Sequence, residues 1–174
     1  MTIVSPSHPR DVPIGDSNLL LDYWQAGCGA QFAPMWSRDF SLEDLPTGLI
    51  PNLAVVDVLD GGLDYFYRFW GTNNTNRKGY EMSGKLLTAS PHPGTIQSGF
   101  EQFGWVLREK RPMALAFHPH YGVKSLSNQM TYRFPLSSDG VTVDKIVSYQ
   151  PLNLDPKSWE ELFESLHNDD DIRD

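Results

Sequence analysis

The spacing of hydrophobic and polar residues changes several times along the chain, and each change marks a new element. Residues 17–26 place apolar side chains at helical spacing after the capping residue Asp16, which predicts a short helix. Residues 53–59 and 63–70 are instead rich in β-branched and aromatic residues. Because these two runs flank Gly61 and Gly62, they predict a β-hairpin.

The predicted hairpin separates its side chains into two unlike faces. With Gly61 and Gly62 as the loop, Asp57 lies opposite Phe66 and diagonal to Arg68. The face with that charged pair holds Val55, Asp57, Phe66, Arg68 and Trp70. The other face is entirely apolar or aromatic, and we expect it to pack on the core: Ala54, Val56, Val58, Tyr65, Tyr67 and Phe69.

A longer helix and three further strands are expected in the second half of the chain. The helix begins near Thr95 and ends before Pro112, and its apolar stripe consists of Ile96, Phe100, Phe103 and Leu107. The strands cover residues 113–121, 129–136 and 142–150. A last helix begins at Asp155 and presents an apolar side made of Trp159, Leu162, Phe163 and Leu166.

This order of elements predicts an α+β fold, with a five-stranded antiparallel sheet covered by helices on one face and further helices toward both ends. Residues 1–15 hold three prolines and no periodicity, so we expect a mobile arm there. Residues 16–154 form the domain, and residues 155–174 form an amphipathic acidic helix and tail.

The net charge of −8 is concentrated at one end of the 174-residue chain. Residues 155–174 hold eight acids and two bases, a net of −6, whereas residues 1–154 hold 14 acids and 12 bases, a net of −2. Because the body carries no basic stripe, nucleic acid is excluded as the expected partner.

Hydrophobicity and cysteine content indicate in which cellular compartment we expect the protein. No apolar run approaches the ~20 residues that a membrane span needs, and the first residues lack the apolar core of a signal peptide, so no membrane partner is expected. The single cysteine, Cys28, excludes an internal disulfide framework and a cysteine-built zinc site. We therefore expect a cytoplasmic protein with an inert thiol.

Known catalytic and metal-binding motifs are incomplete in this sequence. The segment Gly79 to Leu86 approaches a phosphate-binding loop but has Leu86 where a Ser or Thr must hold magnesium. His118 and His120 share a strand face, yet no spacing identifies a third metal ligand. No histidine lies between Thr95 and Arg111 to hold a haem. The sequence predicts no catalytic residue and no metal site, and it identifies no cofactor.

Two features remain as candidates for binding, and each has a structural alternative. Arg68 either pairs with Asp57 across the hairpin or anchors an anionic ligand. The aromatic side chains between sheet and helix either fill the core or line an apolar pocket. We select Tyr67, Phe69, Phe103 and Tyr132 as pocket walls, with Arg68 and His118 as the polar groups.

Several short stretches, in their order and spacing, resemble a bacterial family of short PAS-like proteins over roughly residues 19–150. They are Asp22-Tyr-Trp24, Asp44-Leu-Pro46, Ile50-Pro51, Val56-Asp57-Val58, Tyr67-Arg-Phe-Trp-Gly-Thr72, Met82-Ser-Gly-Lys85 and Phe134-Pro-Leu-Ser-Ser-Asp-Gly140. The sequence departs from the family's pattern at residues 30–38, where a basic stretch is expected, and it lacks a flavin-binding cysteine motif at residues 73–85, which argues against a light sensor.

The resemblance implies a PAS fold with strand order 2-1-5-4-3 and a sensory role in bacterial signalling, and it supplies no ligand. Our first hypothesis is a domain that binds a small molecule or a signalling partner. The second is a ligand-free interaction or dimerisation module, in which helices bearing Trp24 and Trp159 form the contact surface. The third is a small enzyme with His118 or Asp57 as base.

Overall fold

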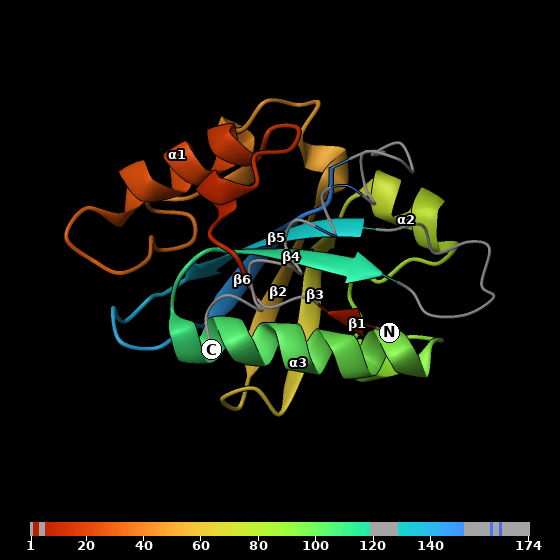
Figure 1. Ribbon diagram of the computed structural model, residues 1–174. Coiled ribbons are helices and arrows are strands. Elements are labelled where there is room, and N and C mark those ends of the chain that lie inside the picture. Colours follow the sequence, from red (N-terminus) through yellow and green to blue (C-terminus); the bar gives the residue numbers. More distant parts are fainter. Residues whose placement is uncertain (1, 4–5, 119–128, 152–160, 162–163, 165–174) are drawn as a thin grey trace, which may run out of the picture.

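The computed structural model describes residues 2–3, 6–118, 129–151, 161 and 164, and its centre is one six-stranded antiparallel sheet (Figure 1). The strands are β1 (Thr2–Ile3), β2 (Leu53–Leu59), β3 (Asp64–Trp70), β4 (Met113–His118), β5 (Gln129–Leu136) and β6 (Lys145–Tyr149). Their order is β1-β4-β5-β6-β2-β3. The α+β class is confirmed, and the five predicted strands lie in the order 2-1-5-4-3 among themselves. The short β1 adds a sixth strand beside β4.

The hairpin of β2 and β3 has the predicted pairing at its loop end and a different one at its other end. Asp57 pairs with Phe66 as predicted. The register then shifts at Arg68, so that Val56 faces Tyr67 while Val55 faces Phe69. Such a β-bulge turns every residue beyond it to the opposite face.

This bulge corrects the face assignment made from strict alternation. Trp70, which the alternation placed with the charged pair, packs in the same buried cluster as Tyr67. Phe69 packs on the other side of the sheet, against the cluster that contains Val55.

Within residues 6–118, three α-helices and four short 3₁₀ turns surround the sheet. The α-helices are α1 (Ser17–Cys28), α2 (Thr72–Lys78) and α3 (Pro93–Glu109), and the 3₁₀ turns are η1 (Pro9–Asp11), η2 (Leu42–Asp44), η3 (Ile50–Asn52) and η4 (Leu87–Ala89). α1 and α3 occupy the segments where helical periodicity predicts them. None of the helices among the described residues is long and apolar enough to cross a membrane.

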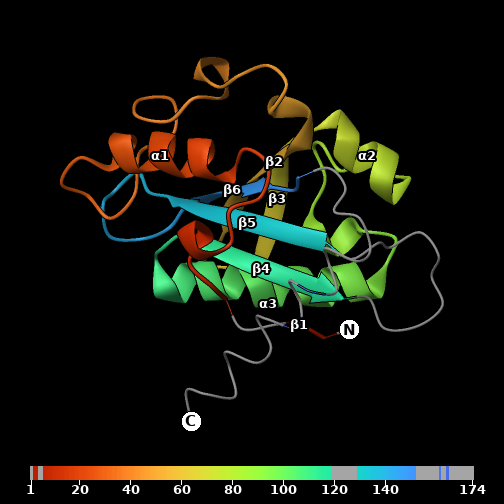
Figure 2. The ribbon, with the colours of Figure 1, turned by 45° about the horizontal axis from the view of Figure 1, so that its top comes forward.

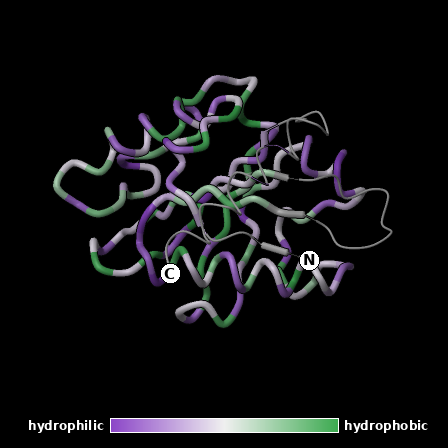
Figure 3. The backbone as a smooth tube through the Cα atoms, in the orientation of Figure 1, coloured by the Kyte–Doolittle hydropathy of each residue, from purple (hydrophilic) through white to green (hydrophobic). Residues whose placement is uncertain are grey.

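The sheet is covered on both faces, so the expectation of helices on one face is wrong. α1 and α3 lie on opposite sides of the sheet in Figures 1 and 2. One buried cluster joins α1 to one face of the sheet, and a second joins α3 and η4 to the other. The reason lies in the central strands, where β6 sends Val147 to one cluster and Ile146 to the other. In Figure 3, hydrophilic and hydrophobic segments alternate along both helices, as expected when one side of a helix packs and the other meets water.

α1 buries the tryptophan that the interaction-module hypothesis placed at a contact surface. Trp24 is buried, and its Nε1 donates a 2.7 Å hydrogen bond to the Pro135 carbonyl of β5. Its ring therefore holds α1 on the sheet and is not free for a partner. Trp159, the other tryptophan of that hypothesis, lies outside the described residues, as does the predicted C-terminal helix apart from Glu161 and Glu164.

Residues 6–15, which the sequence assigns to a mobile arm, lie against the sheet. Ser7 exchanges backbone hydrogen bonds with Ala114, and Val12 is buried. The Tyr132 hydroxyl donates a hydrogen bond to the Val12 carbonyl. The three prolines had suggested a segment without a fixed position. These contacts show that an extended, proline-containing segment can still pack along the edge of the sheet.

Candidate functional site

A continuous row of paired residues crosses five strands on the face that α3 covers. From β4 to β3 the row is Met113, Arg133, Ser148, Ala54 and Trp70. Its two central members, Ser148 and Ala54, are small, whereas the residues beside them, Arg133 and Trp70, are long. The centre of this face is therefore lower than its surroundings.

The small side chains are not sealed by the helices above them. Ala54 and Ser148 keep 7% and 6% of their surface accessible, although they lie on central strands. Trp70 keeps 7%, whereas Val56 and Ile146 in the neighbouring row keep 1% and 0%. The centre of the row is therefore slightly less covered than the neighbouring row. We call it the recess, and its lining is Ala54, Tyr67, Trp70, Arg133 and Ser148.

Arg133 brings a positive charge into this space without an acidic partner among the described residues. Its Nε and Nη2 donate to the Gln102 Oε1 of α3 at 3.0 and 2.5 Å, and its Nη1 donates to the Ser148 Oγ at 2.5 Å. Its guanidinium lies over the Phe103 ring, 4.4 Å from the ring centre. Desolvation lowers the pKa of Arg133 to about 10, so the group is charged at neutral pH.

A second cation, Lys78 at the end of α2, lies within electrostatic reach of Arg133. The Lys78 side chain is half-buried, and no hydrogen bond or ion pair joins its ammonium to the described residues. Desolvation, together with repulsion from Arg77 and Arg133, lowers the pKa of Lys78 to about 8. The groups that act on these two cations therefore include a further cation, Arg77, and no acid.

Two tyrosine hydroxyls near these cations also lack hydrogen-bond partners among the described residues. Tyr80 has a buried Oη with no partner. Tyr67 is buried, and desolvation raises its pKa to about 12, so its hydroxyl remains protonated. The rings of Tyr67 and Tyr80 both contact Trp70, with centres 5.0 and 6.2 Å from it. A buried polar atom without a partner requires an explanation, and a ligand that pairs with it is one.

α3 turns a polar side toward this site, which differs from the predicted apolar stripe. Its buried residues are Ser98, Gly99, Gln102, Phe103 and Val106. The predicted stripe residues Ile96, Phe100 and Leu107 are only half-buried, at the margins of the contact. The helix is rotated in this way because Gln102 holds Arg133 and because Gly99 lies close to Leu87, whose side-chain methyl groups would be under 3.0 Å from an added Cβ.

The structure brings together only two of the six residues predicted to bind a ligand. Tyr67 and Phe103 lie on the α3 face. Phe69 and Tyr132 lie on the α1 face, separated from the first pair by the sheet. The fifth residue, His118, ends β4, and its side chain lies outside the described residues.

Arg68, the sixth, is an exposed residue whose charge is already matched. Its Nη2 lies 2.6 Å from the Asp57 Oδ2, and Lys145 lies 3.3 Å from the other oxygen of that carboxyl. Burial alone would raise the pKa of Asp57, but these two cations outweigh it and lower the pKa. The geometry fits the cross-strand pair that the sequence offered as the structural alternative.

Sequence reasoning missed Arg133, Lys78 and Tyr80. Arg133 could have been found, because it stands alone as a charge inside the apolar run Met130 to Leu136. A charged residue in the centre of such a run either faces solvent or is buried and held by specific polar interactions. Lys78 and Tyr80 carry no such signal, since the folding of α2 toward the sheet is what places them here.

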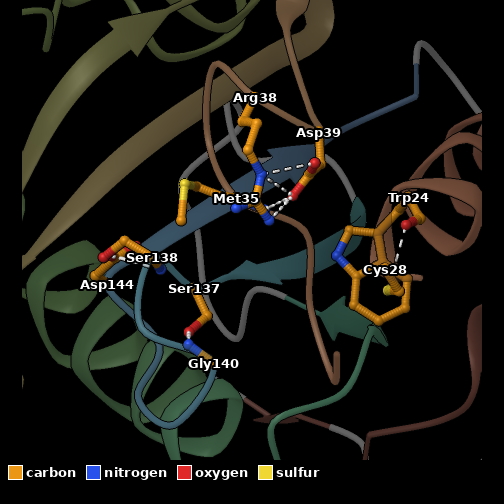
Figure 4. A network of polar contacts seen from close by, with 9 residues as sticks. All are labelled: Trp24, Cys28, Met35, Arg38, Asp39, Ser137, Ser138, Gly140 and Asp144. Carbon is orange, nitrogen blue, oxygen red and sulfur yellow. Dashed lines mark hydrogen bonds and ion pairs between the residues drawn. The ribbon is translucent and has the colours of Figure 1, made fainter. Parts of the chain in front are cut away.

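Polar groups elsewhere form local contacts that close loops. Figure 4 shows examples, in which Asp39 binds Arg38 and the Met35 amide, and the Ser138 side chain binds Asp144. The Cys28 thiol donates to the Trp24 carbonyl, and burial raises its pKa to about 11, which fits the expected inert thiol. Among the described residues, no group of three or more His, Cys, Asp and Glu side chains could hold a metal ion.

Comparison with protein-family models, with curated proteins and with solved structures finds no match for this chain.

Proposed function

We propose that this protein is a PAS-like sensory domain that binds a small molecule in the recess and passes its state to a signalling partner. The recess is the observation that carries the proposal. A sheet face that kept side chains only for packing would be sealed at its centre, as the neighbouring Val56 and Ile146 are. Here the centre keeps some accessible surface, and Arg133, which has no acidic partner among the described residues, and the unpartnered hydroxyl of Tyr80 lie on the same face.

The strand order supports the same proposal. It agrees with the order that the resemblance to PAS-like proteins implies. Domains of that kind bind their ligands between the sheet and the helices of one face, and the recess lies between the sheet and α3. In bacterial signalling such a domain acts in the cytoplasm.

A shift between two packings of α3 is the mechanism that the contacts favour. Gln102 of α3 is bonded to Arg133 of β5, so a ligand that competes for Arg133 changes how the helix is held. Gly99 allows close contact between α3 and Leu87 of η4, so a change in the position of α3 displaces η4 as well. A ligand that binds one of these packings more tightly raises its population and alters the surface presented to a partner.

The first experiment is native mass spectrometry and an absorption spectrum of freshly purified protein. We expect a bound non-protein mass that is released on denaturation. The Tyr67→Ala variant should lose this mass and any ligand-induced rise in melting temperature, because it removes one wall of the recess. Phe69→Ala is the matched control, since it shortens an aromatic residue of the same strand on the opposite face and should retain the mass.

The outcome also separates this function from the alternatives. A protein that carries no bound mass and forms a defined dimer would contradict the sensory proposal and support the ligand-free interaction module. Equal loss of ligand in both variants would show that β3 is needed for folding and that the recess is not the binding site.

A further inference from the structure

No acid among the described residues pairs with Arg133 or Lys78, the two cations near the recess. The charged and titratable groups that act on Arg133 there are Tyr67 and Tyr65, and those that act on Lys78 are Arg77 and Arg133. None of these is an acid at neutral pH. A buried cation without an anion costs several kcal/mol of desolvation, and folded proteins normally offset it with a carboxylate.

The donors that Arg133 leaves unused indicate where an anion would bind. A guanidinium has five N–H groups, and three of them are engaged by Gln102 and Ser148. One N–H therefore remains on each of the two terminal nitrogens. Two such nitrogens can bind both oxygens of one carboxylate, and this bidentate pair is a strong charge-assisted hydrogen bond.

Building on the proposed function, we propose that the ligand is a small organic carboxylate with an apolar or aromatic body, whose acid group binds Arg133 and Lys78. The unpartnered hydroxyl of Tyr80, whose ring contacts Trp70, is a further donor on the same side.

The apolar part of the ligand follows from the rest of the lining. Trp70 and Tyr67 meet edge to face with ring centres 5.0 Å apart, and Ala54 forms the floor beside them. Aromatic walls of this kind favour a planar or branched apolar group. Arg133 lies toward one end of the row and Trp70 at the other, so a ligand with an acid at one end and an apolar group at the other matches both.

A phosphate is a poorer match for the same groups. Phosphate sites combine cations with several backbone N–H groups at a helix start or in a glycine-rich loop. The recess is lined by side chains of four paired strands, whose backbone N–H groups are engaged in the sheet.

The test compares acids with neutral molecules of the same shape. Benzoate and phenylacetate are titrated into the full-length protein at pH 7, with benzamide, phenylacetamide and inorganic phosphate as comparison probes. The readouts are melting temperature and calorimetric affinity. We expect the two acids to bind and to raise the melting temperature, and the two amides to bind at least tenfold more weakly.

Variants connect the binding to the named residues. Arg133→Met and Lys78→Met should each weaken benzoate binding by at least tenfold, because each removes a positive charge from the site. Arg68→Met is the matched control, since its charge lies on the exposed side of β3 with Asp57, and it should retain the wild-type affinity. Circular dichroism of each variant establishes that the fold is kept, and Lys78→Met remains informative if Arg133→Met fails to fold.

The outcomes distinguish a failure of the carboxylate inference from a failure of the proposed function. Equal binding of acids and amides, unchanged in Arg133→Met and Lys78→Met, would overturn the carboxylate inference and leave a small-molecule site in place. Phosphate binding as tight as benzoate would overturn the choice of carboxylate. No binding by any probe, together with no co-purified mass, would overturn the inference and the proposed function together.

Discussion

Arg133 and Lys78 are the residues whose presence needs the most explanation, because each is a cation removed from solvent without an acid beside it among the described residues. Arg133 is 9% exposed and Lys78 is half-buried, yet neither meets an acid among the described residues. Replacing a buried charge by an apolar residue of similar size is often neutral or stabilising. A stable core alone would not require these cations, whereas an anion-binding site would.

Lys78→Met should therefore stabilise the ligand-free protein. Methionine has nearly the length of lysine and needs no hydration, and no hydrogen bond among the described residues is lost. We expect the free energy of unfolding to rise by roughly 1 kcal/mol, the lower end of the range for such replacements, because the side chain is only half-buried. Urea unfolding at pH 7 measures this change, and a clear loss of stability would show that Lys78 has a structural partner.

The same lysine predicts how stability depends on pH. Its pKa is about 8 in the folded protein and 10.5 when unperturbed, so between these values the unfolded chain binds more protons. The cost of folding with a charged Lys78 is complete below pH 8 and disappears as the pH rises toward 10.5. Wild-type stability should therefore rise relative to Lys78→Met across this interval.

Urea unfolding of both proteins at pH 7, 8, 9 and 10 checks this dependence. The comparison with Lys78→Met removes the contributions of other groups that titrate nearby, such as Cys28. A constant difference between the two proteins would contradict a lowered pKa for Lys78.

At the scale of elements, the junction between β3 and α2 controls the site. The bulge at Arg68 turns Trp70 toward the recess, and Gly71 then begins the turn into α2, which carries Lys78. A Cβ at Gly71 would lie 2.2 Å from the Pro51 carbonyl oxygen, a backbone atom that cannot move aside easily. Close passage of these two segments of backbone is therefore required.

Gly71→Ala should be strongly destabilising. We expect a loss of about 3 kcal/mol, because relief of the clash needs a shift of the backbone at the end of β3 or in η3. Gly48→Ala is the matched control, since a Cβ there meets no atom within 4 Å, and its effect should stay within about 0.5 kcal/mol. Chemical unfolding of the two variants measures the contrast, and equal effects would show that the Gly71 junction can relax.

At the scale of the whole molecule, the charge and the core belong to different parts of the chain. The two buried clusters are built from residues between Val12 and Tyr149. Most of the net charge, −6 of −8, belongs to residues 155–174. The domain thus has a nearly neutral body with a strongly acidic terminal segment.

A chain truncated after Leu154 should therefore remain folded, with its net charge reduced to −2. We expect the circular dichroism spectrum and the melting temperature to change little, and self-association or partner binding to change. Circular dichroism and light scattering coupled to size-exclusion chromatography measure these quantities. A truncated protein that unfolds or aggregates would assign residues 155–174 to the core.

The sequence by itself determined the five main strands, their approximate limits and the hairpin pairing at Asp57. Hydrophobic periodicity and turn residues are sufficient for this, because they reflect interactions between residues that are close together in the chain. The α+β class followed from the order of those elements. The tertiary structure decided which faces are covered, since only the assembled sheet shows that β6 sends apolar side chains to both faces.

The candidate site was largely beyond the reach of the sequence for the same reason. Strict alternation placed Phe69 beside Tyr67, but the bulge at Arg68, which no local pattern announces, separates them. Periodicity ranked the apolar residues of α3 and so overlooked Gln102, whose burial depends on Arg133 from a strand 31 residues away. The sequence determined elements because their signals are local, and the tertiary structure decided the site because its charges meet only across the folded sheet.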